Sequence, residues 1–538
     1  MSDDPCHVDP DEPRPRSEDG DPDAAKLLED MTSAGNVGTP PEAVGGVTPP
    51  GMGRVAMRGG ISTTASRVAT VGIGLVATAA LARLLRPEDF GLVAKVTALT
   101  GLINLLGELG TSIAVVQAPA LNRDQEAAFF WWNGLVSLGL GVILAAASPL
   151  IAAFYADTRV IGITLIIALA VTIRGVGVVP LALLRRRCAF TTVSVIHVAA
   201  TVFAAIVAVM LTRPLGHYAL PAQTAALAVM TTLGAVVVSG GIPGIRFRRT
   251  GIGGQFRLGM NFTAIGLVNY FARNLDNILI GKYISEAALA NYTKAYGLLM
   301  LPLSQVAQPI SQVAVPTLSR LQDRPEEYRR IFLRGASLSF LVQVPASILV
   351  ACAARPLVLT MLGDQWTRAI PIFYALAPAV LTSTTAPGTY WIIPSLGLAG
   401  RQFWIVCVNT AIIISAIVVG LRFGVLGVAY AFSAASVLLR YPSLLYSMKP
   451  SPVGVHEFLA TGLVPLGASV IAGASCLGAA AAWEPTSAPL ALLYRSLVFT
   501  IVYVVCVWRT SPGRRAWAMT RRHLLPKLPG KLAGCSTS

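Results

Sequence analysis

The stretch NYFARNLDNILIGKYIS, residues 269–285, holds an arginine and an aspartate in a mainly apolar segment. Arg273 and Asp276 are spaced so that they lie one turn apart on the same face of a helix. A helix needs about 20 predominantly apolar residues to cross a bilayer, and the chain around this stretch supplies them. Charge at membrane depth is costly and often marks a functional site. The stretch therefore predicts a transmembrane helix that carries functional charge.

The composition of the whole chain indicates many such helices. Hydrophobic residues make up 54% of the chain and charged residues only 13%, whereas soluble domains carry about 25% charged residues. A 19-residue hydropathy window predicts about fourteen spans in an all-α polytopic membrane protein. The eighth and tenth spans contain prolines that can break or kink them. The predicted spans are residues 61–83, 91–115, 128–150, 161–183, 190–211, 218–240, 258–281, 287–315, 331–353, 369–393, 402–421, 424–446, 457–481 and 487–508.

The ends of the chain and its loops predict an orientation. Residues 1–55 are rich in Asp, Glu and Pro and poor in large apolar side chains, which predicts a disordered tail. This segment lacks the basic and apolar regions of a signal peptide. Basic residues gather in alternate loops, such as 185–187 and 320–334, so the positive-inside rule predicts that both termini are cytoplasmic. We interpret the net charge of +16 as loops beside anionic lipid rather than nucleic-acid binding.

A weak internal repeat indicates how the spans are grouped. LLRPEDFGLVAKV (84–96) aligns with YISEAALANYTKA (283–295), which places Lys95 on Lys294. Chance similarity is the alternative explanation, but repeats of this kind are typical of transporters. The predicted organisation is an acidic tail (1–55), two parallel six-helix lobes (56–250 and 251–450), two additional helices (451–510) and a basic cytoplasmic tail (511–538).

Three segments resemble a known family. They are LLRPEDFGLVAKVTALTGLINLLGELGTSIAVVQ (84–117), ALLRRRCAFTTVSVI (182–196) and residues 273–332. In this order they are similar to oligosaccharide flippases of the Wzx type, which belong to the MOP exporter superfamily together with MATE transporters and the lipid II flippase. The resemblance implies two lobes around a central cavity. It also implies movement of a polyprenyl-pyrophosphate-linked glycan from the inner to the outer leaflet of a bacterial cell membrane.

The resemblance also implies partners. The ligand would be a lipid-linked oligosaccharide, and membrane lipids would surround the chain. A polysaccharide polymerase and export machinery are further candidates, and no nucleic acid or cofactor is expected. The acidic tail is not part of the family pattern.

Five cations at predicted membrane depth are candidates for contacts with the pyrophosphate, because a guanidinium can donate two hydrogen bonds to phosphate at once. Alternatives remain open: Arg273 can form a structural pair with Asp276, and Arg67 can anchor at the interface. The two lysines can form a symmetric basic site or extend to the interface. Asp276 and Glu108 are candidates for charge pairing or for coupling to an ion. The five cations are Arg67, Arg174, Arg273, Lys95 and Lys294.

Uncharged polar side chains follow one face of the predicted eighth span. Gln305, Gln308 and Gln312 recur at spacings of three and four residues, which is the period of a helix face. Amides suit sugar hydroxyls, and Tyr292 is an aromatic candidate for contact with a sugar. Hydrogen bonding between helices is the alternative role for these amides.

Several catalytic signatures are missing from the sequence. It contains no GxxxxGK[ST] loop, no HExxH motif and no Cys/His cluster, so we expect no ATP site and no metal site. The predicted outer loops are short, which disfavours a membrane enzyme of glycan assembly. A drug or cation antiporter of the MATE type would share the fold but would favour acidic cavity residues. A secondary transporter with a basic cavity is therefore the preferred interpretation.

Overall fold

The computed structural model describes residues 52–108, 111–117, 121–244, 270 and 274–510. Within these ranges every regular element is a helix, and the residues from 59 on form one compact unit. Residues 1–51 of the predicted acidic tail, the predicted basic tail, most of the predicted seventh span, Arg273 and the side chain of Glu108 lie outside the described residues. The last residues of the predicted acidic tail, 52–55, belong to the first helix.

The helices of the first half lie near the predicted spans, and α5 starts at a clear local sequence signal. Before α5, the Asn122 side chain accepts from the backbone N–H of Gln125, and the Gln125 side chain accepts from that of Asn122. This capping box satisfies two donors that a helix start leaves unpaired. The helices are α2 (Met52–Leu84), α3 (Pro87–Glu108), α4 (Thr111–Gln117), α5 (Arg123–Tyr155), α6 (Arg159–Arg186), α7 (Phe190–Leu215) and α8 (Ala219–Ser239).

The second half contains the two spans that prolines made uncertain. α10 starts at Ser285, whose hydroxyl caps the helix, and continues through Pro302 and Pro309 as one helix of 34 residues. By contrast, α13 is bent by 42° relative to the segment that contains α14 and α15, which confirms a break in the tenth span. The elements are residues 274–283, α10 (Glu286–Ser319), α11 (Pro325–Cys352), α12 (Ala354–Met361), α13 (Ala369–Ser383), α14 (Pro387–Tyr390), α15 (Ile392–Ser395), α16 (Ala399–Gly420), α17 (Gly424–Met448), α18 (Val455–Ala482) and α19 (Ala488–Arg509).

Among the described residues, nine helical segments are long and apolar enough to cross a membrane, or ten with the bent pair. Two of the nine, Phe190–Ser239 and Ala399–Met448, are 50 residues long. A straight helix of that length would extend about 75 Å, more than twice the apolar thickness of a bilayer. Each segment instead contains two helices that pack against each other, α7 with α8 and α16 with α17. The chain is therefore a multi-pass membrane protein, and a total of fourteen spans stays a prediction.

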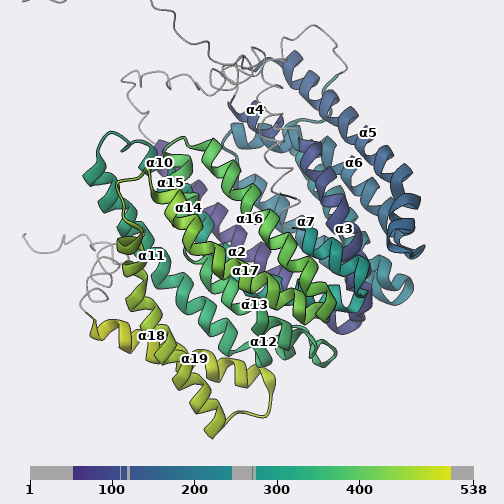
Figure 1. Ribbon diagram of the computed structural model, residues 1–538. Helices are drawn as coiled ribbons and strands as arrows, with labels where there is room; N and C mark the ends of the chain where they lie inside the picture. The colour runs from purple at the N-terminus through teal and green to yellow at the C-terminus, as the bar shows by residue number, and fades with distance from the viewer. Residues whose placement is uncertain (1–51, 109–110, 118–120, 245–269, 271–273, 511–538) are drawn as a thin grey trace, which may run out of the picture. The chain divides into compact units, whose positions relative to one another are not determined.

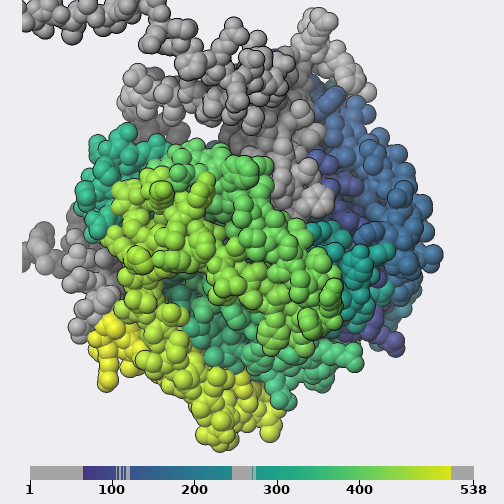
Figure 2. Space-filling model, in the orientation of Figure 1, coloured from purple at the N-terminus to yellow at the C-terminus, as the bar shows by residue number. Residues whose placement is uncertain are grey.

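Helix neighbours fall into two groups joined through α3. In the first group α6 packs on α5 and α8; in the second, α10 packs on α11 and α13, and α17 on α13 and α16. α3 packs on both α6 and α10, and a Cβ on Gly91 would lie 2.1 Å from the Glu286 carbonyl oxygen, so the α3 and α10 backbones approach closely. α18 and α19, yellow in Figure 1, lie beside α11. In the space-filling view, α16 and α17 cover much of the visible face (Figure 2).

Candidate functional site

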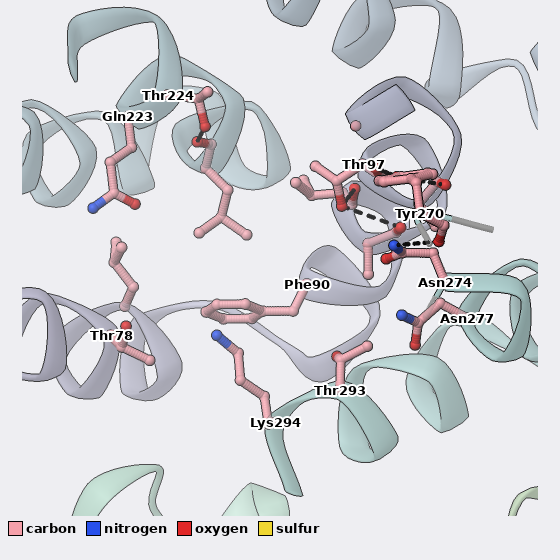
Figure 3. Close-up of a pocket in the computed structure, with 16 residues that line it drawn as sticks. Thr78, Phe90, Thr97, Gln223, Thr224, Tyr270, Asn274, Asn277, Thr293 and Lys294 are labelled. Atoms are coloured by element: carbon pink, nitrogen blue, oxygen red, sulfur yellow. Dashed lines mark hydrogen bonds between the residues drawn. The ribbon is translucent and has the colours of Figure 1, made fainter. Parts of the chain in front are cut away.

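A cavity of about 490 Å³ lies where α2, α3, α8, α10, Tyr270 and residues 274–283 meet. We call it the α3–α10 cavity. Hydroxyl and amide groups from both halves of the chain line it, together with apolar side chains from α2 and α3 (Figure 3). Lys294 is the only charged side chain among its described lining residues. Its other polar lining residues are Thr78, Thr97, Gln223, Thr224, Tyr270, Asn274, Asn277 and Thr293.

The Lys294 ammonium lies against an aromatic ring. Its Nζ is 4.3 Å from the ring centroid of Phe90, on α3, and Figure 3 shows the two side chains facing each other. The electron-rich ring face attracts the cation without neutralising it. In the part of the chain that the structure describes, no carboxylate forms an ion pair with Lys294. The cavity therefore contains a positive charge that is available to an anion.

A group of four charged residues, which we call the Glu286 network, ties α3 to the start of α10. Lys95 Nζ and Arg159 Nη2 each lie 3.0 Å from Glu286 Oε1. Arg159 Nη2 also lies 2.8 Å from Asp157 Oδ2, in the turn between α5 and α6. Burial raises the pKa of the Asp157 carboxyl, but the hydrogen bonds from Arg159 outweigh burial and lower the pKa to about 2. Lys95 is buried, so its only described ion pair compensates a charge that water does not reach.

A second polar contact joins α2 to α10 further along α10. The Arg67 Nε donates to Gln305 Oε1 over 3.0 Å, and its Nη2 donates to Gln308 Oε1. No described carboxylate pairs with Arg67. At 1.5 Å per residue, Gln305 lies about 16 Å along α10 from Lys294 and about 28 Å from Glu286. The α3–α10 cavity therefore lies between the Glu286 network and the Arg67 contact.

The remaining predicted residues have other surroundings. The Tyr292 hydroxyl donates to Asp276 Oδ2 over 3.0 Å, and Tyr292 is only 1% exposed, so this pair is packed beneath the cavity. Arg174 lies near the middle of α6 with an exposed side chain. Gln312 lies with Gln308 on a separate cavity against α11. Of the predicted cations, the structure thus brings Lys294 into the α3–α10 cavity.

The sequence interpretation missed two charged residues of interest. Glu286 was overlooked because it lies in the first turn of α10, where a carboxylate looks like an ordinary helix start. Arg440 was overlooked although it lies within α17, eight residues before Met448. A complete scan of the apolar spans for ionisable residues would have found Arg440. The role of Glu286 depends on the packing of α10 against α3.

These helices define a multi-pass membrane protein, and comparison with known proteins gives the family. The profile of a family described as "Polysaccharide biosynthesis protein" matches residues 80–371, just over half of the chain, and the chain belongs to this family. It is 23% identical to the Escherichia coli lipopolysaccharide biosynthesis protein WzxC over 399 residues, which cover 72% of this chain and 80% of that protein. It is 25% identical to the Bacillus subtilis teichuronic acid biosynthesis protein TuaB over 273 residues, 50% of this chain and 56% of TuaB.

Solved structures agree on the fold. The lipid II flippase MurJ, in an inward closed conformation, superposes with a TM-score of 0.66 and 15% identity, over 87% of this chain and 100% of that chain. An inward-facing MATE transporter of the MOP superfamily superposes with a TM-score of 0.60 and 13% identity. The superposition covers 73% of this chain and 95% of that chain. At these identities the likeness is one of fold. The expected resemblance to Wzx-type flippases and the expected all-helical transporter fold are confirmed.

Proposed function

We propose that this chain moves a polyprenyl-pyrophosphate-linked oligosaccharide across the bacterial cytoplasmic membrane by alternating access. Membership in the polysaccharide biosynthesis family and the similarity to WzxC support the class of substrate. The observation that carries the proposal is the Lys294 ammonium, which lies in a cavity between both halves of the chain without a described carboxylate partner. A cation in such a place attracts an anion strongly because the surrounding dielectric is low.

The two polar contacts on either side of the cavity give the proposed access mechanism. Under the positive-inside orientation both termini are cytoplasmic, so the start of α10 lies at the outer side and its end at the inner side. The Glu286 network then closes the outer side, and the contact of Arg67 with Gln305 lies towards the inner side. Opening one contact while the other holds would expose the cavity to one side at a time.

Each of the five predicted cations has a proposed role in this cycle. Lys294 holds the pyrophosphate in the cavity, and Arg67 contacts it at the inner side, with Arg174 and Arg273 as further phosphate contacts. Lys95 stabilises the closed outer side. The lobes are residues 56–250 and 251–450, and residues 451–510 add two helices. The lipid tail stays in the bilayer while the charged headgroup crosses through the cavity.

A cation antiporter, the alternative from the sequence, would need an acidic group in the cavity. The described lining of the α3–α10 cavity contains Lys294 and no carboxylate. Asp276, which precedes the lining residue Asn277, is hydrogen bonded to the buried Tyr292. These contacts favour an anionic substrate.

The test is reconstitution into liposomes with a fluorescent polyprenyl-pyrophosphate-linked sugar, followed by its accessibility in the two leaflets over time. We expect wild type to move the probe and Lys294→Gln to slow movement at least tenfold, because one charge–phosphate hydrogen bond contributes about 1.5–3 kcal/mol. Lys449→Gln is the matched control, because Lys449 is an exposed lysine that directly follows α17. Normal movement by Lys294→Gln at equal reconstitution would contradict the proposal.

A further inference from the structure

A second cavity, of about 380 Å³, lies between α10, α11 and α14. We call it the α10–α11 cavity. Its described lining contains amides, hydroxyls and two aromatic rings but no charged side chain. An ion in this cavity would therefore lack a counter-charge from its walls. The polar and aromatic lining residues are Gln308, Ser311, Gln312, Gln343, Tyr390 and Trp391.

A broken helix forms one wall of this cavity. α13 ends at Ser383, and the chain turns by 42° before it continues at Pro387. Hydroxyls near the break bond to local carbonyls, with Thr382 and Ser383 donating to Ala379 over 2.8 and 3.0 Å. A helix that breaks at membrane depth is tolerated where it lines a cavity or is buried in protein. In transporters such breaks commonly form substrate sites.

Part of the lining is fixed and part is free to meet a ligand. The Trp391 Nε1 donates to Ser311 Oγ over 2.8 Å, and Trp391 is 2% exposed, so this side chain is held in place. The Gln343 amide donates to Ser339 Oγ. Tyr390 is 55% exposed, and neither its hydroxyl nor the Gln312 amide has a described hydrogen-bond partner. These two side chains offer a ring face, a hydroxyl and an amide to an incoming group.

This set of groups matches an uncharged sugar. An amide can both donate to and accept from sugar hydroxyls, and the C–H face of a sugar ring packs against an aromatic face. Most of the exposed lining is carbon, as such packing requires. Pockets of this kind orient a ligand with a few polar groups in a mainly apolar wall.

The α10–α11 cavity also borders a cation. Gln308 lines the cavity and accepts a hydrogen bond from Arg67, so this guanidinium lies at the cavity rim. Arg440 lies within α17, which packs against α14, the helix that contains Tyr390. An anionic group at Arg67 would therefore place whatever is attached to it next to the α10–α11 cavity.

We propose that the α10–α11 cavity is a subsite for the uncharged sugar next to the pyrophosphate, which Gln312 and Tyr390 bind while Arg67 holds the phosphate. This inference rests on the proposed function. The proposed function assigns a site to the pyrophosphate, and the inference assigns a site to the adjacent sugar. Tyr390 takes the place of Tyr292 as the proposed aromatic contact with the sugar. Tyr292 is buried and its hydroxyl is hydrogen bonded to Asp276.

The test compares the affinities of two probes for the full chain in lipid nanodiscs: polyprenyl pyrophosphate, and the same lipid carrying one neutral hexose. We expect wild type to bind the hexose-bearing probe about tenfold more tightly, the value of one or two hydrogen bonds and a ring contact. Tyr390→Leu and Gln312→Leu should each lose most of this preference while binding bare polyprenyl pyrophosphate as wild type does. Arg67→Gln should weaken both probes by a similar factor.

Two controls keep the result interpretable. Tyr374→Leu removes a tyrosine of similar exposure, 47%, that does not line the cavity, and it should keep the preference. Tyr390→Phe retains the ring and should keep most of it. Equal affinity of wild type for both probes, or an unchanged preference in both cavity variants, would overturn the subsite alone. Binding of neither probe by wild type would overturn the proposed function and the subsite with it.

Discussion

Glu286→Gln should open the outer side of the cavity. Glu286 is the residue of its network that belongs to α10, and it connects α10 to Lys95 on α3 and to Arg159 on α6. In the closed state the Lys95 side chain is 7% exposed and that of Glu286 is 16% exposed. An amide in place of the carboxylate would leave the Lys95 ammonium buried without a counter-charge. When the outer side opens, water can reach the ammonium, so the cost falls on the closed state.

The magnitude follows from this burial. Removing one partner of a buried ion pair costs about 3–5 kcal/mol. A glutamine oxygen can still accept a hydrogen bond from Lys95, which restores about 1 kcal/mol. The contact with Arg159 adds little, because that side chain is 52% exposed. A net shift of about 2–4 kcal/mol would move the closed–open equilibrium roughly 30- to 700-fold towards the open state.

The assay measures access to the cavity from outside. Thr293 lines the α3–α10 cavity, so Thr293→Cys in a chain lacking the seven native cysteines reports whether a membrane-impermeant maleimide can enter. With Glu286→Gln we expect at least tenfold faster labelling from outside. Glu88→Gln is the control, because Glu88 is exposed in the first turn of α3 and forms no described ion pair. Equal labelling rates with and without Glu286→Gln would refute the role of the network in closure.

Three further predictions test neighbouring parts of the mechanism. Gly91→Ala places a Cβ 2.1 Å from the Glu286 carbonyl oxygen, so α3 and α10 must separate and outside labelling should rise; Gly74→Ala, with nothing within 4 Å, should leave it unchanged. Asp157→Asn should lower the melting temperature at neutral pH. The folded pKa of Asp157, about 2, lies below its ordinary 3.8, so the difference from wild type should persist above about pH 4 and shrink as pH falls towards 2. Arg440→Gln should slow probe movement in the liposome assay, because it removes a cation from α17, which packs against α14, the helix that contains Tyr390; wild-type rates would contradict this.

The positions of the helices could be predicted well because the membrane imposes a simple rule on the sequence. The span predicted at 190–211 is observed as Phe190–Leu215, and the span predicted at 457–481 as Val455–Ala482. The prolines predicted helix breaks less reliably. They mark the break before Pro387, yet α10 passes Pro302 without one. Neighbouring helices can support a proline-containing segment, and the sequence does not reveal which segments have that support.

The candidate site was harder to predict because its contacts join residues far apart in the chain. Arg67 and Gln305 were both identified as polar groups at membrane depth, but they are 238 residues apart and their hydrogen bond depends on how α2 packs on α10. Lys95 and Glu286 are 191 residues apart. Hydropathy locates a charge in a helix, whereas its partner is set by the crossing of two helices. Residue types could therefore be predicted, and their pairing could not.

Lys95 and Lys294, which the internal repeat aligns, differ in the residues that they contact. Lys95 and Lys294 both reach across the close approach of α3 and α10, but Lys95 meets the Glu286 carboxylate and Lys294 meets the ring of Phe90. The repeat aligns Glu286 with Pro87 and Phe90 with Leu289, so neither partner has a counterpart in the other half. Among the described residues, Lys95 thus forms an ion pair with a carboxylate, whereas Lys294 faces an aromatic ring in the α3–α10 cavity. The sequence left two interpretations of the repeated lysines open, a symmetric basic site and extension of both side chains to the interface. The difference between the two lysines lies in the residues that they contact.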